Sequence, residues 1–191
     1  SHAGYIKRLS VSSYKRQGRG GKGVTGMTTR DEDFVEGMFI ASTHHYILFF
    51  TDKGRCYWLK VYEVPEGGRA AKGRQISNLL EMKPDEKIAA YIAVKEFDEQ
   101  HFVVMATREG TIKKTALSEF SNPRKAGIIA ATVDGKDLLI EAKMTDGSED
   151  IILVTTQGQA CRFHESDVRA MGRNAGGVRG ITLDKKDFVV G

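Results

Sequence analysis

The sequence predicts an all-β protein built from four similar antiparallel units, and two features of the sequence support that class. Four short blocks resemble one another: SHAGYIKRLS from Ser1, TDKGRCYWLK from Thr51, TREGTIKKTA from Thr107 and TTQGQACRFH from Thr155. Apolar runs typical of strands, YILFFT, FVVMAT and IILVTT, lead into the last three blocks. Each block is therefore predicted to form a strand, a tight turn and a second strand.

A glycine lies in the turn of each predicted hairpin. Glycine suits such a turn because it adopts a positive φ without steric cost. The four hairpins are centred near Gly4, Gly54, Gly110 and Gly158, with spacings of 50, 56 and 48 residues. A further extended run precedes each of the last three hairpins, which gives at least three strands per unit: residues 37–42, 88–94 and 138–144.

A unit of about 50 residues made of antiparallel strands has the size of a propeller blade. One such unit cannot bury both of its faces, so neighbouring units must stack. We therefore expect residues 1–191 to form one domain of about four blades, with short helical turns near residues 76–82 and 164–171. A β-sandwich is the alternative, but the fourfold match of turn, strand and charge disfavours it.

The composition is that of a soluble globular protein. Hydrophobic residues make up 40% of the 191 residues, and no apolar run approaches the ~18 residues of a membrane-spanning helix. The first ten residues lack the apolar core of a signal peptide. Cys56 and Cys161 match no metal-ligand or disulfide spacing, which favours free thiols in a reducing cytoplasm.

The charge alternates in sign along the chain, with a period near that of the repeat. Residues 1–30 hold seven Lys or Arg and no acid, whereas residues 31–51 hold four acids and no base. The net charge is only +4. This alternation predicts that equivalent segments of the repeat gather their bases on one face of the molecule.

The segment after each hairpin places Arg or Lys among Gly or Ala. These segments are residues 12–27, 62–79, 118–133 and 166–183. Glycine lets a backbone approach a ligand and exposes its N–H groups, and Arg and Lys meet phosphate oxygens. Such loops offer little shape to discriminate bases, so we expect salt-dependent binding to a nucleic-acid backbone.

Nucleotide-binding and catalytic motifs are not met. A phosphate-binding loop needs Ser or Thr after its lysine, but Gly23 follows Lys22, and no helix is expected after it. The five histidines have no metal or triad spacing, and His44 and His45 would point to opposite faces of a strand. We therefore expect no catalytic or metal-binding residues.

The run QGRGGKG, residues 17–23, resembles the seven-residue box Q-[RK]-R-G-G-[RK]-G of the C-terminal domain of the DNA gyrase A subunit. Six of the seven positions match, and the departure is Gly18, where the family has a base. GYIKRLSVSSYKRQ before it and AGGVRGI from Ala175 are also similar to that family, so the resemblance covers essentially the whole chain. It implies a β-pinwheel fragment whose blades exchange strands, with a DNA duplex wrapped around its basic rim.

The resemblance also implies which residues contact DNA. The box residues are Gln17, Gly18, Arg19, Gly20, Gly21, Lys22 and Gly23. The expected rim residues are Lys7, Arg8, Lys15, Arg16, Arg55, Arg69, Lys72, Arg74, Lys113, Lys114, Arg124, Lys125, Arg162, Arg173 and Arg179.

The resemblance further implies a part in negative supercoiling by an ATP-dependent type II topoisomerase. The partners would be duplex DNA, the rest of the gyrase A protein and the ATP-hydrolysing gyrase B protein in an A2B2 assembly, in the bacterial cytoplasm near the nucleoid. The cleaving tyrosine would lie elsewhere in the A protein, and ATP and Mg²⁺ would bind elsewhere in the assembly, so no cofactor is expected in this domain. The alternatives are the related domain of topoisomerase IV and a propeller used for protein recognition.

Overall fold

The computed structural model describes residues 1–29 and 32–191, and its regular structure is almost all β. Five single-turn 3₁₀ helices interrupt the loops: η1 (Val11–Ser13), η2 (Val61–Glu63), η3 (Ile76–Asn78), η4 (Leu117–Phe120) and η5 (Glu165–Asp167). The strands are β1 (Tyr5–Ile6), β2 (Tyr46–Thr51), β3 (Arg55–Lys60), β4 (Arg74–Gln75), β5 (Ile88–Val94), β6 (Phe102–Thr107), β7 (Thr111–Ala116), β8 (Ile128–Ile129), β9 (Leu139–Thr145), β10 (Asp150–Val154), β11 (Ala160–His164) and β12 (Val178–Arg179).

Three of the four sheets among the described residues combine strands from successive repeats. The hairpin β2–β3 pairs with β5 along one edge and with β8, which follows the next hairpin, along the other. The hairpin β6–β7 pairs in the same way with β9 and β12, and β1 pairs with β4 of the second repeat. All of these pairs are antiparallel, so the predicted all-β class with repeated antiparallel blades is confirmed, and neighbouring blades exchange strands.

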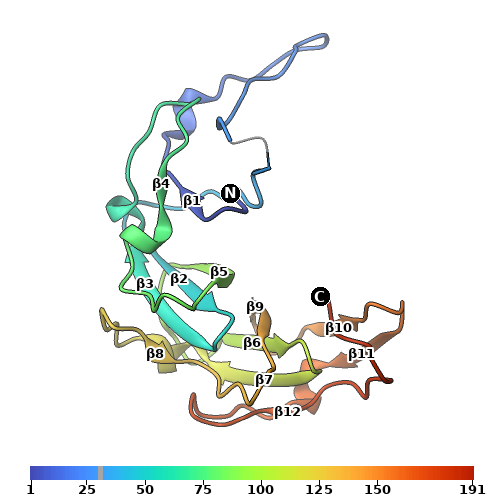
Figure 1. Cartoon of the computed structure of the whole chain (residues 1–191). Coiled ribbons are helices and arrows are strands. Elements are labelled where there is room, and N and C mark those ends of the chain that lie inside the picture. Colours follow the sequence, from blue (N-terminus) through green and yellow to red (C-terminus); the bar gives the residue numbers. More distant parts are fainter. Residues whose placement is uncertain (30–31) are drawn as a thin grey trace.

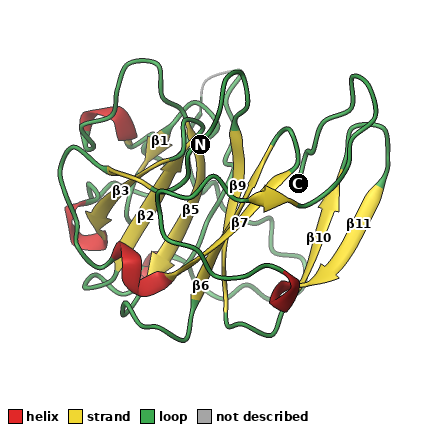
Figure 2. Ribbon diagram, turned by 90° about the horizontal axis from the view of Figure 1, so that it is seen from below, coloured by secondary structure: helices red, strands yellow, loops and turns green. Residues whose placement is uncertain are grey.

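The four sheets follow one another along a curved row, from the β1–β4 pair to the β10–β11 pair (Figure 1). Long loops and the short 3₁₀ turns lie at the ends of the strands (Figure 2). The turn glycines Gly4, Gly54, Gly110 and Gly158 have φ of 81°, 73°, 86° and 82°. These values are the left-handed conformation that glycine adopts without strain.

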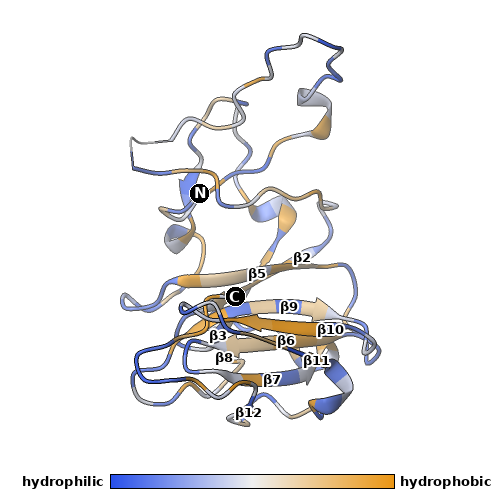
Figure 3. Cartoon of the chain, turned by 90° about the vertical axis from the view of Figure 1, so that its right-hand side faces the viewer, coloured by the Kyte–Doolittle hydropathy of each residue, from blue (hydrophilic) through white to orange (hydrophobic). Residues whose placement is uncertain are grey.

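The core lies between stacked sheets, so the central strands are covered on both faces. Leu48 and Phe50 of β2 pack with β6 and β9, while Ile47 and Phe49 face the first sheet. Alternate side chains of a strand point to opposite faces, and here both faces are apolar. Stacking thus explains why β2 is a continuous apolar run, and apolar residues are concentrated in the central strands (Figure 3).

One sequence expectation about strands is wrong, and one segment outside the named strands completes a sheet. Residues 37–42 form no regular strand. The segment 186–191 lies along β10. There the N–H of Val190 bonds the carbonyl of Val154 at 2.8 Å. It therefore occupies the position that β5 and β9 hold in their own sheets.

Candidate nucleic-acid interface

The glycine-rich loop after η1 is closed by its own glutamine. The side-chain Oε1 of Gln17 accepts a hydrogen bond from the backbone N–H of Gly23 at 2.9 Å. Within this closure, the N–H of Gly21 donates to the carbonyl of Gly18 at 3.2 Å. The Gln17 carbonyl group therefore shapes the box, which leaves its amide N–H groups for other partners.

The glycines of this loop serve different purposes. Gly20 and Gly23 have φ of 78° and 70°, which side chains rarely adopt. Gly18 lies outside that region, and a Cβ added there would meet nothing within 4 Å. Arg19 and Lys22, between these glycines, are exposed to solvent.

The same β-turn recurs in the other three repeats. The carbonyl of the first turn residue accepts the N–H of the fourth in residues 68–71, 124–127 and 172–175, at 2.9, 2.8 and 3.1 Å. The box turn, residues 18–21, completes the set. Each of the four turns carries a base at its second position: Arg19, Arg69, Lys125 and Arg173.

Most of the predicted rim residues lie on the surface. The exposed ones are Lys15, Arg16, Arg69, Arg74, Arg124, Lys125, Arg162 and Arg179. The half-buried ones are Lys7, Arg8, Arg55, Lys72 and Arg173. Of the half-buried set, Lys72 lies 3.9 Å from the centre of the Tyr5 ring, and Arg173 contacts Glu119 at 3.8 Å.

The prediction that Lys113 and Lys114 contact DNA is wrong, because both lie inside the fold. Their exposed fractions are 2% and 6%. Lys113 Nζ donates to the carbonyls of Ala130 and Arg173, and Lys114 Nζ donates to the carbonyl of Glu165 at 2.7 Å. Both faces of β7 are covered by neighbouring elements, so alternation along this strand leaves neither lysine outside.

Two half-buried arginines hold the next repeat in place. Arg8 Nε donates to the carbonyl of Val64 at 3.3 Å. Arg55 donates through Nη2 to the carbonyls of Ala126 and Gly127. These guanidinium groups therefore bond backbone carbonyls of the following loop. The sequence had instead predicted that both arginines contact DNA phosphates.

A set of buried acids, missed in the sequence, fixes the hairpin tips. Asp33, Asp137 and Asp187 accept hydrogen bonds from the N–H just before the turn glycine of a hairpin, at 2.8, 2.9 and 3.0 Å. Burial raises the pKa of Asp187, but hydrogen bonds from threonine hydroxyls and backbone N–H groups outweigh this and hold it below its ordinary value. The signal in the sequence was an Asp directly before an apolar residue: Asp33–Phe34, Asp137–Leu138 and Asp187–Phe188.

In the second repeat the equivalent acid is Glu86, which is held differently. It accepts a hydrogen bond from the Tyr57 hydroxyl at 2.6 Å and lies 3.5 Å from Arg55 Nε. Burial and this bond to Glu86 raise the pKa of Tyr57. Glu86 thus links Tyr57 of the β2–β3 hairpin to Arg55, which donates hydrogen bonds to the turn of residues 124–127.

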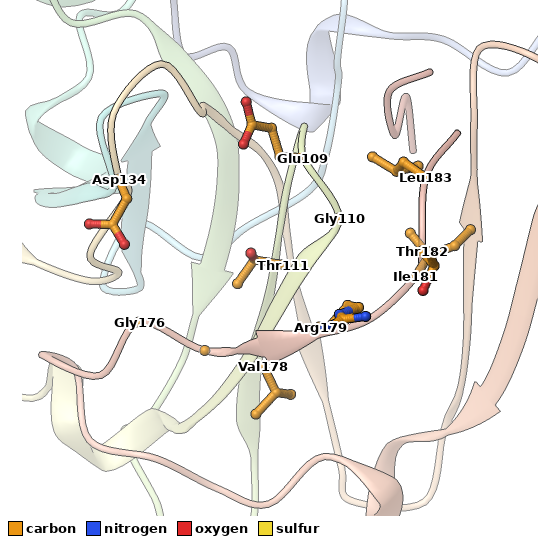
Figure 4. Close-up of a pocket in the computed structure, with 11 residues that line it drawn as sticks. Glu109, Gly110, Thr111, Asp134, Gly176, Val178, Arg179, Ile181, Thr182 and Leu183 are labelled. Carbon is orange, nitrogen blue, oxygen red and sulfur yellow. The ribbon is translucent and has the colours of Figure 1, made fainter. Parts of the chain in front are cut away.

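A groove of about 540 Å³ lies between the third and fourth repeats, beside β12. Figure 4 shows Glu109, Asp134 and Arg179 among its lining residues. Two carboxylates and one guanidinium give this lining a net negative charge, which disfavours a phosphate. We therefore do not expect this groove to bind the DNA backbone.

Within residues 1–29 and 32–191, no group of three or more His, Cys, Asp or Glu side chains is arranged to hold a metal ion. Cys56 is buried and Cys161 is half-buried, and both are free thiols. No helix in this part of the chain is long and apolar enough to cross a membrane.

Known proteins share both the sequence and the fold. The chain matches the DNA gyrase C-terminal domain, a β-propeller, over residues 1–42, 45–95, 101–146 and 149–191. The DNA gyrase A subunit of Clostridium acetobutylicum is 56% identical over 180 residues, which cover 94% of this chain and 22% of that relative. The chain therefore spans about 22% of the length of this curated relative.

Solved structures agree with this match. The C-terminal domain of DNA topoisomerase IV superposes with a TM-score of 0.84 at 30% identity, covering 100% of this chain and 58% of the other. The DNA gyrase A C-terminal domain superposes with a TM-score of 0.71 at 26% identity, covering 99% and 61%. With its box, its recurring basic turn and its exchanged strands, this chain belongs to the DNA gyrase C-terminal domain family.

Proposed function

We propose that this chain binds duplex DNA through its phosphates, largely independently of base sequence, and bends the duplex along its curved row of blades. The observation that carries this proposal is the β-turn with a base at its second position in all four repeats. Contacts of this kind position a backbone and carry no sequence information.

Several phosphate contacts are needed, because bending DNA is costly. Bending 20–30 bp by 40–90° costs on the order of 1–6 kcal/mol. If the four turn bases and Lys22 each neutralise one phosphate, log Kd should change with log salt concentration with a slope of about 4.5. That dependence is steep enough to separate phosphate binding from association through apolar surface.

We further propose that the chain is the DNA-wrapping part of the gyrase A protein. In that role the wrapped duplex presents a neighbouring segment to the cleavage gate, and strand passage adds negative supercoils. DNA cleavage and ATP hydrolysis then belong to the rest of the A protein and to the gyrase B protein in an A2B2 enzyme, where ATP and Mg²⁺ bind. The enzyme would act in the bacterial cytoplasm, at the nucleoid.

A second candidate role is the corresponding domain of topoisomerase IV. The higher TM-score to that protein, 0.84 against 0.71, favours it, whereas the near-intact box of residues 17–23 favours gyrase. The assembled enzyme decides between them. Negative supercoiling that is lost in Arg19→Ala/Lys22→Ala while relaxation persists supports gyrase, and absence of supercoiling by the unmodified enzyme supports topoisomerase IV.

DNA binding itself is tested with linear duplexes of about 40 and 140 bp across a salt series. The test variant is Arg19→Ala/Lys22→Ala. The matched control is Lys95→Ala/Lys143→Ala, which removes the same charge from two lysines that are 74% exposed and lie outside the four turns.

Tighter binding to the longer duplex, a steep salt dependence and a loss confined to the box variant support the proposal. Equal losses of affinity in the two double variants would mean that net charge alone drives binding and that the four turns do not form a DNA-binding surface. Absence of binding at low salt would contradict DNA binding by this chain.

A further inference from the structure

Lys7, just after β1, uses all three of its N–H donors on one turn of the next repeat. Its Nζ donates to the carbonyls of Gly68 at 2.9 Å, Arg69 at 2.5 Å and Ala71 at 2.8 Å. An ammonium group has three donors and no acceptor, so these bonds occupy it fully. A direct contact between Lys7 and a phosphate would have to break at least one of them.

The three bonds also set the direction of the peptide groups in this turn. In a trans peptide, the N–H of the following residue points opposite to the carbonyl, and residues 1–29 and 32–191 contain no cis peptide bond. With three carbonyls turned towards Lys7, the N–H groups of Arg69, Ala70 and Lys72 point away from it. None of these three N–H groups has a hydrogen-bond acceptor among residues 1–29 and 32–191.

The side chains around the turn strengthen this polarity. Arg69 is exposed at the second position of the turn, and Lys72 is held over the ring of Tyr5. Outward N–H groups beside two cationic side chains are groups that an anion binds. The charge of Lys7, behind the turn, adds to the attraction.

We propose that residues 68–72 form a seat for one phosphate group, and that Lys7 is the positioning residue that holds the seat open. The seat would take a phosphate of the DNA backbone, so this proposal rests on the proposed function. Similar contacts recur at the next two junctions, where Arg55 bonds carbonyls in the turn of residues 124–127 and Lys113 bonds the carbonyl of Arg173. At Lys7, three carbonyls of the same segment converge on one ammonium.

The variant Lys7→Arg distinguishes positioning from direct contact. Arginine keeps the charge and binds phosphate at least as well as lysine. Its planar guanidinium cannot direct three N–H donors from one point, so it cannot gather these three carbonyls. If Lys7 contacts phosphate directly, Lys7→Arg binds DNA like the unmodified chain; if Lys7 positions the turn, Lys7→Arg loses the seat.

The experiment measures binding of a 40-bp duplex across a salt series for the unmodified chain, Lys7→Arg, Arg69→Ala and the double variant. We expect Lys7→Arg to reduce the salt slope by about 0.9, the value for one phosphate contact. We expect no further reduction when Lys7→Arg is added to Arg69→Ala, because both changes disable the same seat. Full affinity in Lys7→Arg, or independent losses that add, would overturn the proposal.

Amide resonances of the unmodified chain give a second readout that does not depend on any variant folding. On titration with a 12-bp duplex, the N–H signals of Arg69, Ala70 and Lys72 should shift downfield as they donate to a phosphate. Shifts in the box of residues 17–23 without shifts in residues 69–72 would refute the seat and leave DNA binding intact. Absence of shifts anywhere would contradict the proposed function itself.

Discussion

Replacing Gly18 by arginine should strengthen DNA binding without altering the fold. Gly18 is exposed, it lies outside the left-handed region, and a Cβ added there would meet nothing within 4 Å. The arginine would stand at the first position of the box turn, beside Arg19. It would therefore add a base at the one box position where this chain departs from the family pattern.

The size of the effect follows from counterion release. One additional phosphate contact steepens the log–log salt slope by about 0.9. Between 200 and 50 mM salt, a fourfold change, the affinity of Gly18→Arg should therefore rise about 3.5-fold more than that of the unmodified chain. Folding stability should stay the same or increase by up to about 1 kcal/mol, because the replacement of glycine restricts the unfolded chain.

Fluorescence anisotropy with a labelled 40-bp duplex measures this slope, and two variants serve as controls. Gly18→Ala makes the same backbone change without the charge and should keep the original slope. Gly20→Arg adds the same charge where φ is 78°, which costs about 1–2 kcal/mol of local strain and should distort the turn. An unchanged slope in a fully folded Gly18→Arg would show that the box turn does not face phosphates, and would refute the reasoning.

Three further predictions concern the box, a buried lysine and a buried acid. Gly21→Ala should weaken DNA binding to the level of Gln17→Ala, because the new Cβ would lie 2.6 Å from Gln17 Oε1 and displace that oxygen from the Gly23 N–H. The test is the DNA affinity of both variants at 100 mM salt, and the affinity of the unmodified chain in Gly21→Ala would contradict the prediction. Burial lowers the pKa of Lys113 from 10.5 to about 8. Between these two pH values the unfolded state holds a proton that the folded state has lost, so the free energy of unfolding rises with pH. Measured by urea unfolding at pH 8 and 10.5, this rise in the free energy of unfolding should be about 3 kcal/mol smaller in Lys113→Met than in the unmodified chain, and equal rises would contradict the burial of this charge. The pKa of Asp187 is held below its ordinary value of 3.8, so the stability that this carboxylate contributes is present above pH 3.8 and is lost as the pH falls through the lowered pKa. Between pH 5 and pH 2.5, Asp187→Asn should therefore lose less stability than the unmodified chain. Equal losses in the two proteins would count against the role given to this carboxylate.

The class of fold could be predicted from the sequence because its signals are local. The apolar runs YILFFT and FVVMAT coincide with β2 and β6, and the turn glycines have positive φ. The exchange of strands could not be predicted in detail. It depends on whether a run such as residues 88–94 pairs with the hairpin before it or with the one after it, and pairing partners leave no mark in the run itself.

The interface was predictable only in part, for a reason that β7 makes clear. Lys113 and Lys114, adjacent on β7, were both expected on the rim from the resemblance to the gyrase family, and adjacent residues of a strand face opposite sides. The stacking of blades covers both sides, and burial of this kind is a property of the assembly of repeats. The roles of Asp137 and Asp187 could not be predicted, because the N–H groups that they accept from, those of Glu109 and Gln157, lie 28 and 30 residues earlier in the chain.

The contacts across the repeats separate two kinds of base that look alike in the sequence. Three bases that lie one to three residues after a hairpin glycine, Lys7, Arg55 and Lys113, donate to carbonyls of the next repeat. At the second position of the following turn, three of the four bases, Arg19, Arg69 and Lys125, are exposed, and Arg173 is half-buried.

Arg162 tests this distinction within the same molecule. It lies four residues after Gly158, the position that Lys114 holds after Gly110. Its strand, β11, pairs only with β10 among the described residues, and its side chain is 71% exposed. The difference between buried Lys114 and exposed Arg162 thus comes from the presence or absence of a neighbouring loop, since their places in the repeat are the same. A base of the first kind is therefore exposed only where no further loop packs against its hairpin, whereas the turn bases of the first three repeats are exposed although other repeats pack beside them.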